Sequence, residues 1–330
     1  MSNTTEYPFA EFIRILGKGK KGSRPLTQDE AYHAMRMILA GEVEEIQLGA
    51  FLMLMRVKEE APEELAGFVL AVRETLPRIS TDIADLDWSA YAGKRRHLPW
   101  YILSSLLLAE NGIKVLMHGS ASHSENRVFA QDMLALFSLP NAASFTQAEQ
   151  QLQARNFAYI SLEQLCPALN RMIHLRSLMG LRSPVHTLVR LINPFNAPYS
   201  IQGIFHPGYR PVHQEAALLL QQAHMTVIKG EGGETERNPD MECLAQSVHN
   251  GTLSEETWPA LFPRRHIKPD KLEPKQLIQL WRGEINDEFA EASIIGTTAV
   301  ALKLLAKAES QESAQKLAAE YWQTRNKNAY

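Results

Sequence analysis

The chain has 330 residues, of which 45% are hydrophobic and 22% are charged, and its formal net charge is −3. This composition is that of a folded protein, and it excludes intrinsic disorder and collagen-like repeats. No apolar run approaches the roughly 20 residues of a membrane helix, and the first residues lack the pattern of a signal peptide, so we expect a cytoplasmic protein that has no membrane partner.

The first 80 residues are typical of a helical domain. Residues 27–30 form a capping-box sequence, and apolar residues then recur at helical spacing up to Gly41. Residues 46–57 are nearly all apolar, which favours a helix that is buried on most sides. Pro62 opens a further helix that runs to about residue 74. The polar stretch 78–89 is typical of a linker.

Beyond this stretch, short apolar runs alternate with helical patterns. Strands are predicted at residues 113–119, 157–160, 200–204 and 225–230, and helices at residues 99–110, 127–137, 214–224 and 293–323. Alternation of strand and helix predicts a mainly parallel sheet with helices on its faces. The two cysteines, Cys166 and Cys243, lie far apart without metal-ligand spacing, so we expect buried free thiols.

The charged residues are segregated along the chain, although their sum is close to zero. Between residues 165 and 193 there are four arginines and two histidines, and no Asp or Glu. Segregated charge can concentrate an anionic partner on one face of a protein. The candidate phosphate-binding residues are Lys18, Lys20, Lys21, Arg24, Lys94, Arg95, Arg96, His97, Arg171, Arg176, Arg182, Arg190, Arg264 and Arg265.

Four sets of motifs, in order along the chain, resemble the anthranilate phosphoribosyltransferase family. They are LTxxEA, MxxILxGE, QLGAFLM and RxK within residues 26–58; residues 114–120, which resemble the family's KHGN loop; Arg176-x-x-x-Gly180-x-Arg182 with Asn193-Pro194, which resemble VRRxLGxRT…NP; and residues 227–233, which resemble VxHGxDG. The chain is most similar to the second, non-tryptophan branch of this family.

The resemblance implies the fold class and an assembly. It predicts an α/β protein in which a helical N-terminal domain, residues 1–80, is joined by helices from about residues 165–190. Residues 81–164 and 191–330 would then form an α/β domain with a central, mainly parallel sheet flanked by helices. It also implies a homodimer formed through the helical domain.

The family's residues for Mg²⁺ and phosphoribosyl pyrophosphate are altered in this chain. The GTGGD turn, whose bare backbone approaches the pyrophosphate, falls on residues 90–94, where Gly93 remains and Lys94 replaces the aspartate. The Asp-Glu pair that binds magnesium falls on Thr235 and Glu236. The NxST residues, which hold phosphate and magnesium, are replaced by Trp100, Ile102 and Leu103, which carry neither hydroxyl nor carboxamide.

Other residues of the family's cleft are retained. The resemblance assigns Arg176 to the carboxylate of the acceptor, and an arginine can bind carboxylate or phosphate in a bidentate manner. Of the KHGN loop, His118 and Gly119 are retained, while Met117 and Ser120 replace the lysine and the asparagine. We place Gly93, His118, Gly119 and Ser120 in the cleft. We assign no catalytic residue, no metal and no cofactor.

Two hypotheses follow. In the first, which we favour, a basic groove on a degenerate phosphoribosyltransferase-like homodimer binds DNA, and RNA by the same contacts, without reading sequence and without phosphoribosyl transfer to anthranilate. Tyr91, Trp100 and Tyr101 would stack on unpaired bases, although a Trp-Tyr pair that opens an apolar helix more often belongs to a core.

In the second hypothesis the chain is a glycosyltransferase, specifically a pentosyltransferase, of altered specificity that acts on an unknown nitrogen acceptor. Lys94, Arg95 and Arg96 would then hold a pyrophosphate in place of the metal. A run of three bulky side chains cannot reproduce the close backbone approach of the glycine turn, which weighs against this alternative.

Overall fold

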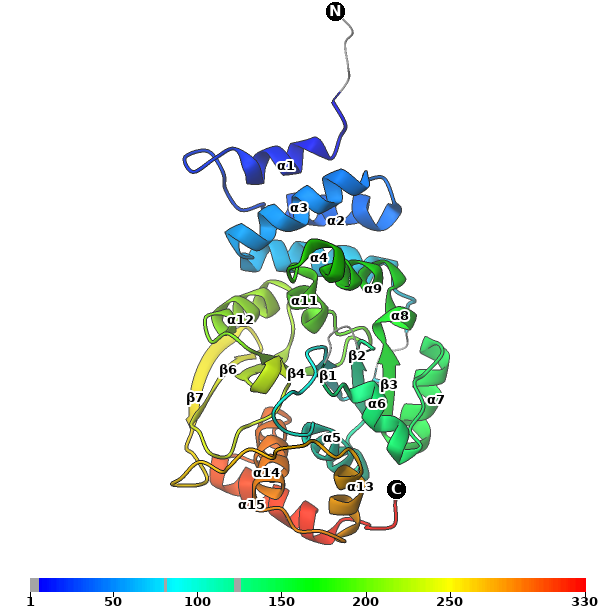
Figure 1. The fold of residues 1–330 in the computed structure, drawn as a ribbon, viewed down its shortest axis with the longest axis vertical. Coiled ribbons are helices and arrows are strands. Elements are labelled where there is room, and N and C mark those ends of the chain that lie inside the picture. Colours follow the sequence, from blue (N-terminus) through cyan, green and yellow to red (C-terminus); the bar gives the residue numbers. More distant parts are fainter. Residues whose placement is uncertain (1–5, 80–81, 122–125) are drawn as a thin grey trace, which may run out of the picture.

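The computed structural model describes residues 6–79, 82–121 and 126–330. A helical domain lies on one side of an α/β domain (Figure 1). Helices from the middle of the chain lie between α4 and the sheet, and Arg73 of α4 donates hydrogen bonds to the carbonyl oxygens of Ile192 and Leu191 at 2.7 and 3.2 Å. The helices of this part are α1 (Ala10–Gly17), α2 (Gln28–Ala40), α3 (Glu45–Lys58), α4 (Pro62–Thr75), α8 (Leu162–Leu165), α9 (Pro167–His174), α10 (Arg176–Met179) and α11 (Val185–Leu188), with the 3-10 turn η2 (Val189–Leu191).

The capping box predicted before α2 is confirmed. Thr27 Oγ1 accepts a hydrogen bond from the backbone N–H of Glu30 at 3.2 Å, and the Glu30 carboxylate accepts one from the N–H of Thr27 at 2.8 Å. The helix ends at Gly41, whose φ of +73° is the left-handed conformation that glycine adopts without strain. The predicted domain boundaries at residues 80, 164 and 190 stay a prediction.

The α/β domain contains a seven-stranded sheet in the order β3-β2-β1-β4-β5-β6-β7. The four pairings among the first five strands are parallel, and the pairings β5–β6 and β6–β7 are antiparallel, which confirms the mainly parallel sheet. Their bounds are β1 (Leu86–Ala90), β2 (Val115–Gly119), β3 (Phe157–Ser161), β4 (Tyr199–Ile204), β5 (His224–Lys229), β6 (Cys243–His249) and β7 (Thr252–Trp258).

Strand β1 corrects the end of the linker predicted at residues 78–89, because residues 86–89 belong to the sheet; residues 80 and 81 lie outside the described ranges. The segment is polar in sequence because Asp87 and Ser89 face inward, and both side chains are buried. Asp87 accepts a hydrogen bond from Ser200 Oγ at 3.1 Å. A buried strand that carries polar residues therefore resembled a solvated connection.

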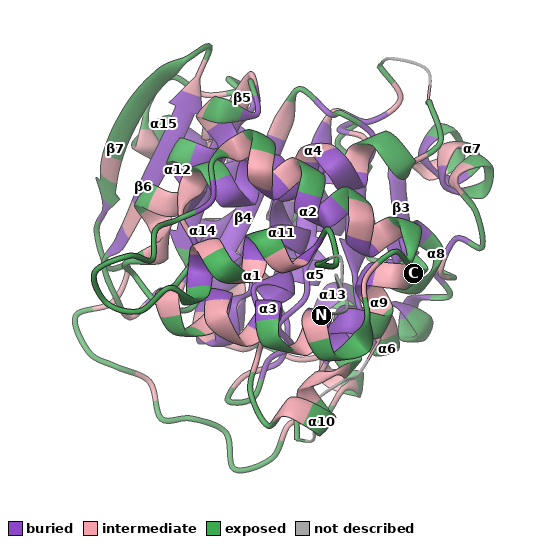
Figure 2. Ribbon diagram, turned by 90° about the horizontal axis from the view of Figure 1, so that it is seen from above, coloured by how far each residue is buried: buried purple, intermediate pink, exposed green. Residues whose placement is uncertain are grey.

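The two faces of the sheet contribute to two hydrophobic cores. Val115 and Met117 of β2 pack with α5 (Tyr101–Glu110), α13 (Lys275–Arg282), α14 (Glu288–Leu304) and α15 (Gln311–Thr324), whereas Leu116 packs with α4, α7 (Phe145–Arg155) and α12 (Tyr209–Leu219). Figure 2 shows the buried residues concentrated in the inner strands and in the inward faces of the helices. Cys166 and Cys243 are buried and unpaired, as predicted. The remaining short elements are α6 (Ala130–Leu134), η1 (Ala135–Phe137) and η3 (Glu231–Gly233).

The topology of the sheet indicates where a ligand would bind. The chain runs outward from β1 to β2 and β3, and then returns to β4 on the other side of β1. In such sheets, ligands bind beyond the carboxyl ends of the strands where the direction of winding reverses. Within the described ranges, no helix is long and apolar enough to cross a membrane.

Candidate functional site

The loop after β1 is held by three carboxylates from the segment that follows β5. Glu234 accepts hydrogen bonds from the backbone N–H groups of Ala92 and Gly93, at 2.8 and 2.5 Å. Gly93 has a φ of +68°, and an added Cβ would lie 3.0 Å from the ring of Phe129. The turn therefore directs its amides at an anion, and that anion is the protein's own glutamate. Burial raises the pKa of Glu234, while these amides and Arg190 act in the opposite direction.

Lys94 is buried inside this contact and only 1% exposed. Its ammonium lies 2.6 Å from Glu236 Oε1 and 3.1 Å from Glu231 Oε2. Burial acts to lower the pKa of Lys94, but the two carboxylates outweigh it and hold that pKa above its ordinary value. The prediction that Lys94 contacts an external phosphate is wrong, because its charge is already neutralised inside the protein.

The same contacts test whether the site fits the Mg²⁺ that the resemblance implies. Glu236 is bonded to Lys94, and its second oxygen accepts the backbone N–H of Tyr101 at 2.8 Å. Thr235, at the other position of the family's acidic pair, offers a hydroxyl that lies 3.5 Å from the carbonyl of Ser89. An ammonium group between the carboxylates would repel a divalent cation. These residues do not fit a magnesium ion.

His97 is also engaged within the protein. Its Nδ1 lies 2.8 Å from Glu231, and its ring stacks on Phe289 with 4.4 Å between centroids. The neighbouring Arg95 and Arg96 are exposed, and the backbone N–H of Arg96 donates to Glu231 at 2.7 Å. Of the basic run 94–97, two side chains remain available to a partner.

The aromatic residues proposed for base stacking belong to the core. Tyr91, Trp100 and Tyr101 are 2%, 4% and 0% exposed. That stacking role is wrong for all three, because none presents a ring face to solvent.

The cleft residues taken from the KHGN resemblance lie inside the sheet. His118 is fully buried, with Nε2 at 3.1 Å from Asp87 and Nδ1 at 2.7 Å from the hydroxyl of Tyr91. A Cβ added to Gly119 would lie 2.2 Å from the carbonyl oxygen of Ala90, so close strand packing requires glycine there. Ser120 is 1% exposed. The placement of these residues in the cleft is therefore corrected: all three are buried, and His118 and Gly119 pack β2 against β1.

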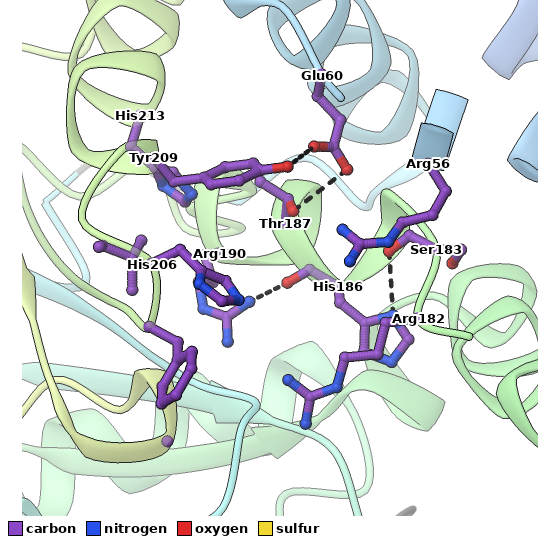
Figure 3. A pocket seen from close by; sticks show the side chains of 13 residues that line it. Arg56, Glu60, Arg182, Ser183, His186, Thr187, Arg190, His206, Tyr209 and His213 are labelled. Atoms are coloured by element: carbon purple, nitrogen blue, oxygen red, sulfur yellow. Dashed lines mark hydrogen bonds between the residues drawn. The ribbon is translucent and has the colours of Figure 1, made fainter. Parts of the chain in front are cut away.

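A cavity of about 110 Å³ lies at the carboxyl ends of β4 and β5, beneath the helical domain (Figure 3). Arg56 of α3, Arg182 and Arg190 surround it in Figure 3. Arg190 is 9% exposed and donates a hydrogen bond to the carbonyl of His186. Among the residues that the structure describes, none of these three arginines has a carboxylate within 4.0 Å. We call this cavity the arginine pocket; it is also lined by Glu60, Ser183, Phe205, His206, Tyr209 and His213.

The arginines of the pocket continue into a larger group. Burial lowers the pKa of Arg182 to about 10, and the charges of four further arginines act in the same direction. The pKa of Arg127 is lowered first by burial, and Arg176 and Arg95 add to this. Like charges held together in this way create a positive potential that attracts anions. The resulting arginine cluster consists of Arg56, Arg95, Arg127, Arg176, Arg182 and Arg190.

Four of these six arginines were candidates from sequence. Arg56 was part of a family motif but gave no sign of binding, because it stands in an apolar helix. Arg127 stands alone in sequence, and only the hydrogen bonds from its Nη1 to the carbonyls of Ala92 and Gly93, at 3.0 and 2.8 Å, bring it beside the loop after β1.

The other predicted basic residues lie on separate surfaces. Lys18, Lys20, Lys21 and Arg24 are exposed in the loop between α1 and α2, which is at the end of the helical domain farthest from the sheet in Figure 1. Arg24 pairs with Glu30 at 2.6 Å. This loop is therefore not part of the arginine pocket, and a single groove through all four basic clusters is not formed within one chain.

Arg171 and the pair Arg264–Arg265 are exposed nearer the α/β domain. Arg171 on α9 lies 3.6 Å from Glu45. Arg264 and Arg265 precede His266, whose ring packs on Phe289 with 5.5 Å between centroids. Because His97 stacks on the same phenylalanine, Arg264 and Arg265 lie on the side of the molecule that carries Arg95 and Arg96.

Comparisons with known proteins agree with this architecture. Residues 10–76 match the helical bundle domain of a glycosyl transferase family, and residues 102–326 match the a/b domain of the same family. The chain is 27% identical over 206 residues to the uncharacterised protein YbiB of Escherichia coli, covering 61% of this chain and 64% of that one. It is 27% identical over 242 residues to an anthranilate phosphoribosyltransferase of Geobacillus kaustophilus, covering 73% and 70%.

Solved structures show the same fold. The crystal structure of anthranilate phosphoribosyltransferase from Thermus thermophilus superposes with a TM-score of 0.78 at 20% identity, covering 96% of this chain and 94% of that one. The helical bundle, the mainly parallel sheet and the family matches over both regions lead to one assignment: this chain belongs to the anthranilate phosphoribosyltransferase-like glycosyl transferase family, together with relatives such as YbiB.

Proposed function

We propose that this protein binds nucleic acid through the arginine cluster, without reading sequence and without transferring phosphoribosyl groups. The observation that carries the proposal is a contrast between two neighbouring sets of charges. Lys94 is paired inside the protein with two carboxylates, those of Glu231 and Glu236, whereas Arg56, Arg127, Arg182 and Arg190 have no carboxylate within 4.0 Å among the described residues. Phosphates supply the missing negative charge, and their neutralisation releases counterions.

Exposed cations around the cluster extend this surface. Arg95 and Arg96 lie beside the loop after β1, and Arg264 and Arg265 lie on the same side of the molecule. Arginine binds phosphate oxygens in bidentate geometry, so such a surface fits a sugar-phosphate backbone of any sequence. Without an exposed ring among Tyr91, Trp100 and Tyr101, affinity rests on these charges.

The second candidate is a pentosyltransferase of altered specificity, and family membership favours it. The arginine pocket would have to hold the phosphates without a metal. Against this candidate stands the loop after β1, whose phosphate-directed amides are already bonded to Glu234.

The test of nucleic-acid binding is a titration of 3′-labelled single strands and duplexes by fluorescence anisotropy at several salt concentrations. We expect the logarithm of the affinity to fall with the logarithm of the salt concentration, with a slope of about −0.7 per phosphate contact for single strands and about −0.9 for duplexes. The double variant Arg95→Glu/Arg96→Glu should bind all sequences at least tenfold more weakly.

A matched control changes the net charge equally at a distant surface. Lys307→Glu/Lys316→Glu alters two exposed lysines near α14 and α15, at the end of the molecule opposite the helical domain (Figure 1). Equal weakening by both double variants, or no binding at low salt, would overturn the proposal. Pyrophosphate release from phosphoribosyl pyrophosphate and Mg²⁺ with any nitrogen acceptor would establish the second candidate instead.

We further propose a homodimer that forms through the helical domain. Ile46 and Val57 on α3 are 83% and 81% exposed. Ala50, which is exposed, and Met53, which is half-buried, lie between them at helical spacing. An apolar stripe of this kind on one helix face is typical of a surface that packs against another protein.

A further inference from the structure

The positive charge of the arginine pocket indicates which class of anion it binds. Three guanidinium groups, those of Arg56, Arg182 and Arg190, face one carboxylate, that of Glu60. Burial lowers the pKa of His213 to about 3, so this histidine is neutral at physiological pH. The charged groups that line the pocket therefore sum to two positive charges, and the buried Glu234 outside the lining also acts on Arg190. A nucleic-acid diester carries one negative charge per phosphate, whereas a phosphate monoester carries almost two, because its second pKa is about 6.

The carboxylate of Glu60 does not occupy the position of the anion between the arginines. Its carboxylate accepts a hydrogen bond from the hydroxyl of Tyr209 at 2.7 Å, and Thr187 Oγ1 lies 3.5 Å away. Burial raises the pKa of Glu60. Its two oxygens are thus directed at Tyr209 and Thr187, on the side of the pocket away from Arg182 in Figure 3.

The pocket also presents unused hydrogen-bonding capacity. Ser183 is 5% exposed, and its Oγ has no hydrogen-bond partner among the described residues. Arg190 is nine-tenths buried, and its guanidinium lies at the carbonyl oxygen of His186 in Figure 3. A buried hydroxyl without a partner is costly. A phosphate group, whose oxygens accept hydrogen bonds from several directions, would satisfy both side chains.

The size of the pocket restricts how much of a ligand enters. Its volume of about 110 Å³ is well below the roughly 300–1,000 Å³ of pockets that enclose a whole small molecule. One phosphate group fits such a space, and the rest of the ligand stays outside. Phe205 lies at the pocket and is 51% exposed, so its ring offers an apolar face to a sugar or base beside the phosphate.

We propose that the arginine pocket binds a terminal phosphate monoester, either the phosphorylated end of a nucleic-acid strand or a small free phosphate ester. That a nucleic-acid strand supplies this phosphate group rests on the proposed function. That the pocket binds a phosphate monoester does not depend on it. In the strand-bound form, Arg95, Arg127 and Arg176, which lie outside the pocket lining, hold internal phosphates, and the pocket holds the end.

The experiment compares single strands of one sequence with a 5′-phosphate, a 3′-phosphate or two hydroxyl ends, labelled at an internal base. We expect one phosphorylated end to bind about tenfold more tightly than the hydroxyl ends, and inorganic phosphate or a nucleoside monophosphate to remove this preference. Titration calorimetry with inorganic phosphate and with the nucleoside monophosphate tests the free ester as the source.

Two variants localise the preference. Arg182→Gln and Ser183→Ala should reduce the ratio of affinities for phosphorylated and hydroxyl strands towards one, whereas Arg171→Gln, an exposed arginine outside the pocket, should leave that ratio unchanged. Thermal unfolding of each variant shows that it is folded. The ratio is the readout because a general loss of charge lowers both affinities together.

The outcomes separate the two proposals. Equal affinity for all three strands, with no heat from inorganic phosphate or the monophosphate, would refute the phosphate pocket and leave nucleic-acid binding intact. Heat from the phosphates without binding of any strand would refute nucleic-acid binding and support the pocket with a free ester as its ligand. A preference that Arg182→Gln leaves unchanged would place the end-recognition site elsewhere and refute the pocket.

Discussion

Lys94 and Glu234 show how single side chains replace a bound ligand. In the family pattern the turn after β1 binds a pyrophosphate that is chelated by a metal. Here Glu234 supplies an anion to the amides of Ala92 and Gly93, and Lys94 supplies a cation to Glu231 and Glu236. Both charges belong to the chain itself, and both are engaged in contacts within it. Removing one partner of such a buried pair costs about 3–5 kcal/mol, because the other charge remains buried and unpaired.

Replacing Lys94 tests this role. We expect Lys94→Met to lower the free energy of unfolding by about 3 kcal/mol, because Glu231 and Glu236 lose their shared cation. Arg95→Met at the exposed neighbouring position should change it by less than about 0.5 kcal/mol. Urea denaturation of both variants measures the difference. If Lys94→Met is as stable as Arg95→Met, the buried pair has no structural role.

Helix α12 contacts the sheet through a buried histidine. His213 Nδ1 lies 2.7 Å from Gln202 Oε1 on β4, and the histidine is 1% exposed. Burial, and to a lesser extent the charge of Arg190, lower its pKa to about 3. The ordinary pKa of histidine is about 6.5, so the unfolded chain binds a proton at this residue below pH about 6.5 while the folded chain does not.

The stability of the protein should therefore decrease in mild acid. The contribution of His213 is complete above pH about 6.5, and it is lost by up to about 1.4 kcal/mol per pH unit as the pH falls from there towards about 3. His213→Gln should reduce the slope of unfolding free energy against pH between pH 6 and 5 by about that amount. Identical slopes for His213→Gln and the wild type would contradict the assignment.

Sequence patterns predicted the elements that follow a local rule. The capping box at Thr27, the helix stop at Gly41 and four of the seven strands could be read from the chain because neighbouring residues determine them. Strand β1 could not, because the partner of its buried Asp87 is Ser200 on β4, which is distant in sequence.

The candidate site was predicted less well than the fold, for the same reason. Lys94 and Arg182 are both cations in basic stretches, yet Lys94 meets two glutamates from 137 and 142 positions away, whereas Arg182 meets other arginines. The sign of the charges that surround a residue is a property of the tertiary structure. A basic cluster in sequence therefore predicts an anion site only after its internal partners are known.

The whole molecule leaves apolar surface uncovered on the face of the helical domain formed by α3. This surface carries Ile46 and Val57, which are more than four-fifths exposed, and a second copy of the chain packed there would bury both. A dimer would also carry two arginine clusters, so that one long strand can engage both. Linking two binding sites in this way raises the overall affinity without any new contact.

Carboxylates introduced on the exposed face of α3 should separate the two subunits. We expect the wild type to sediment as a dimer, and Ile46→Glu/Val57→Glu to sediment as a folded monomer, because each interface would bury four carboxylates without partners. Ile267→Glu, at an apolar residue that is 97% exposed outside the helical domain, should remain a dimer. The monomeric variant should bind strands long enough to span both clusters at least tenfold more weakly than the wild type, and short strands with the same affinity. Analytical ultracentrifugation and anisotropy titrations measure both effects; a wild-type monomer, or a variant that stays dimeric, would show that α3 is not the interface.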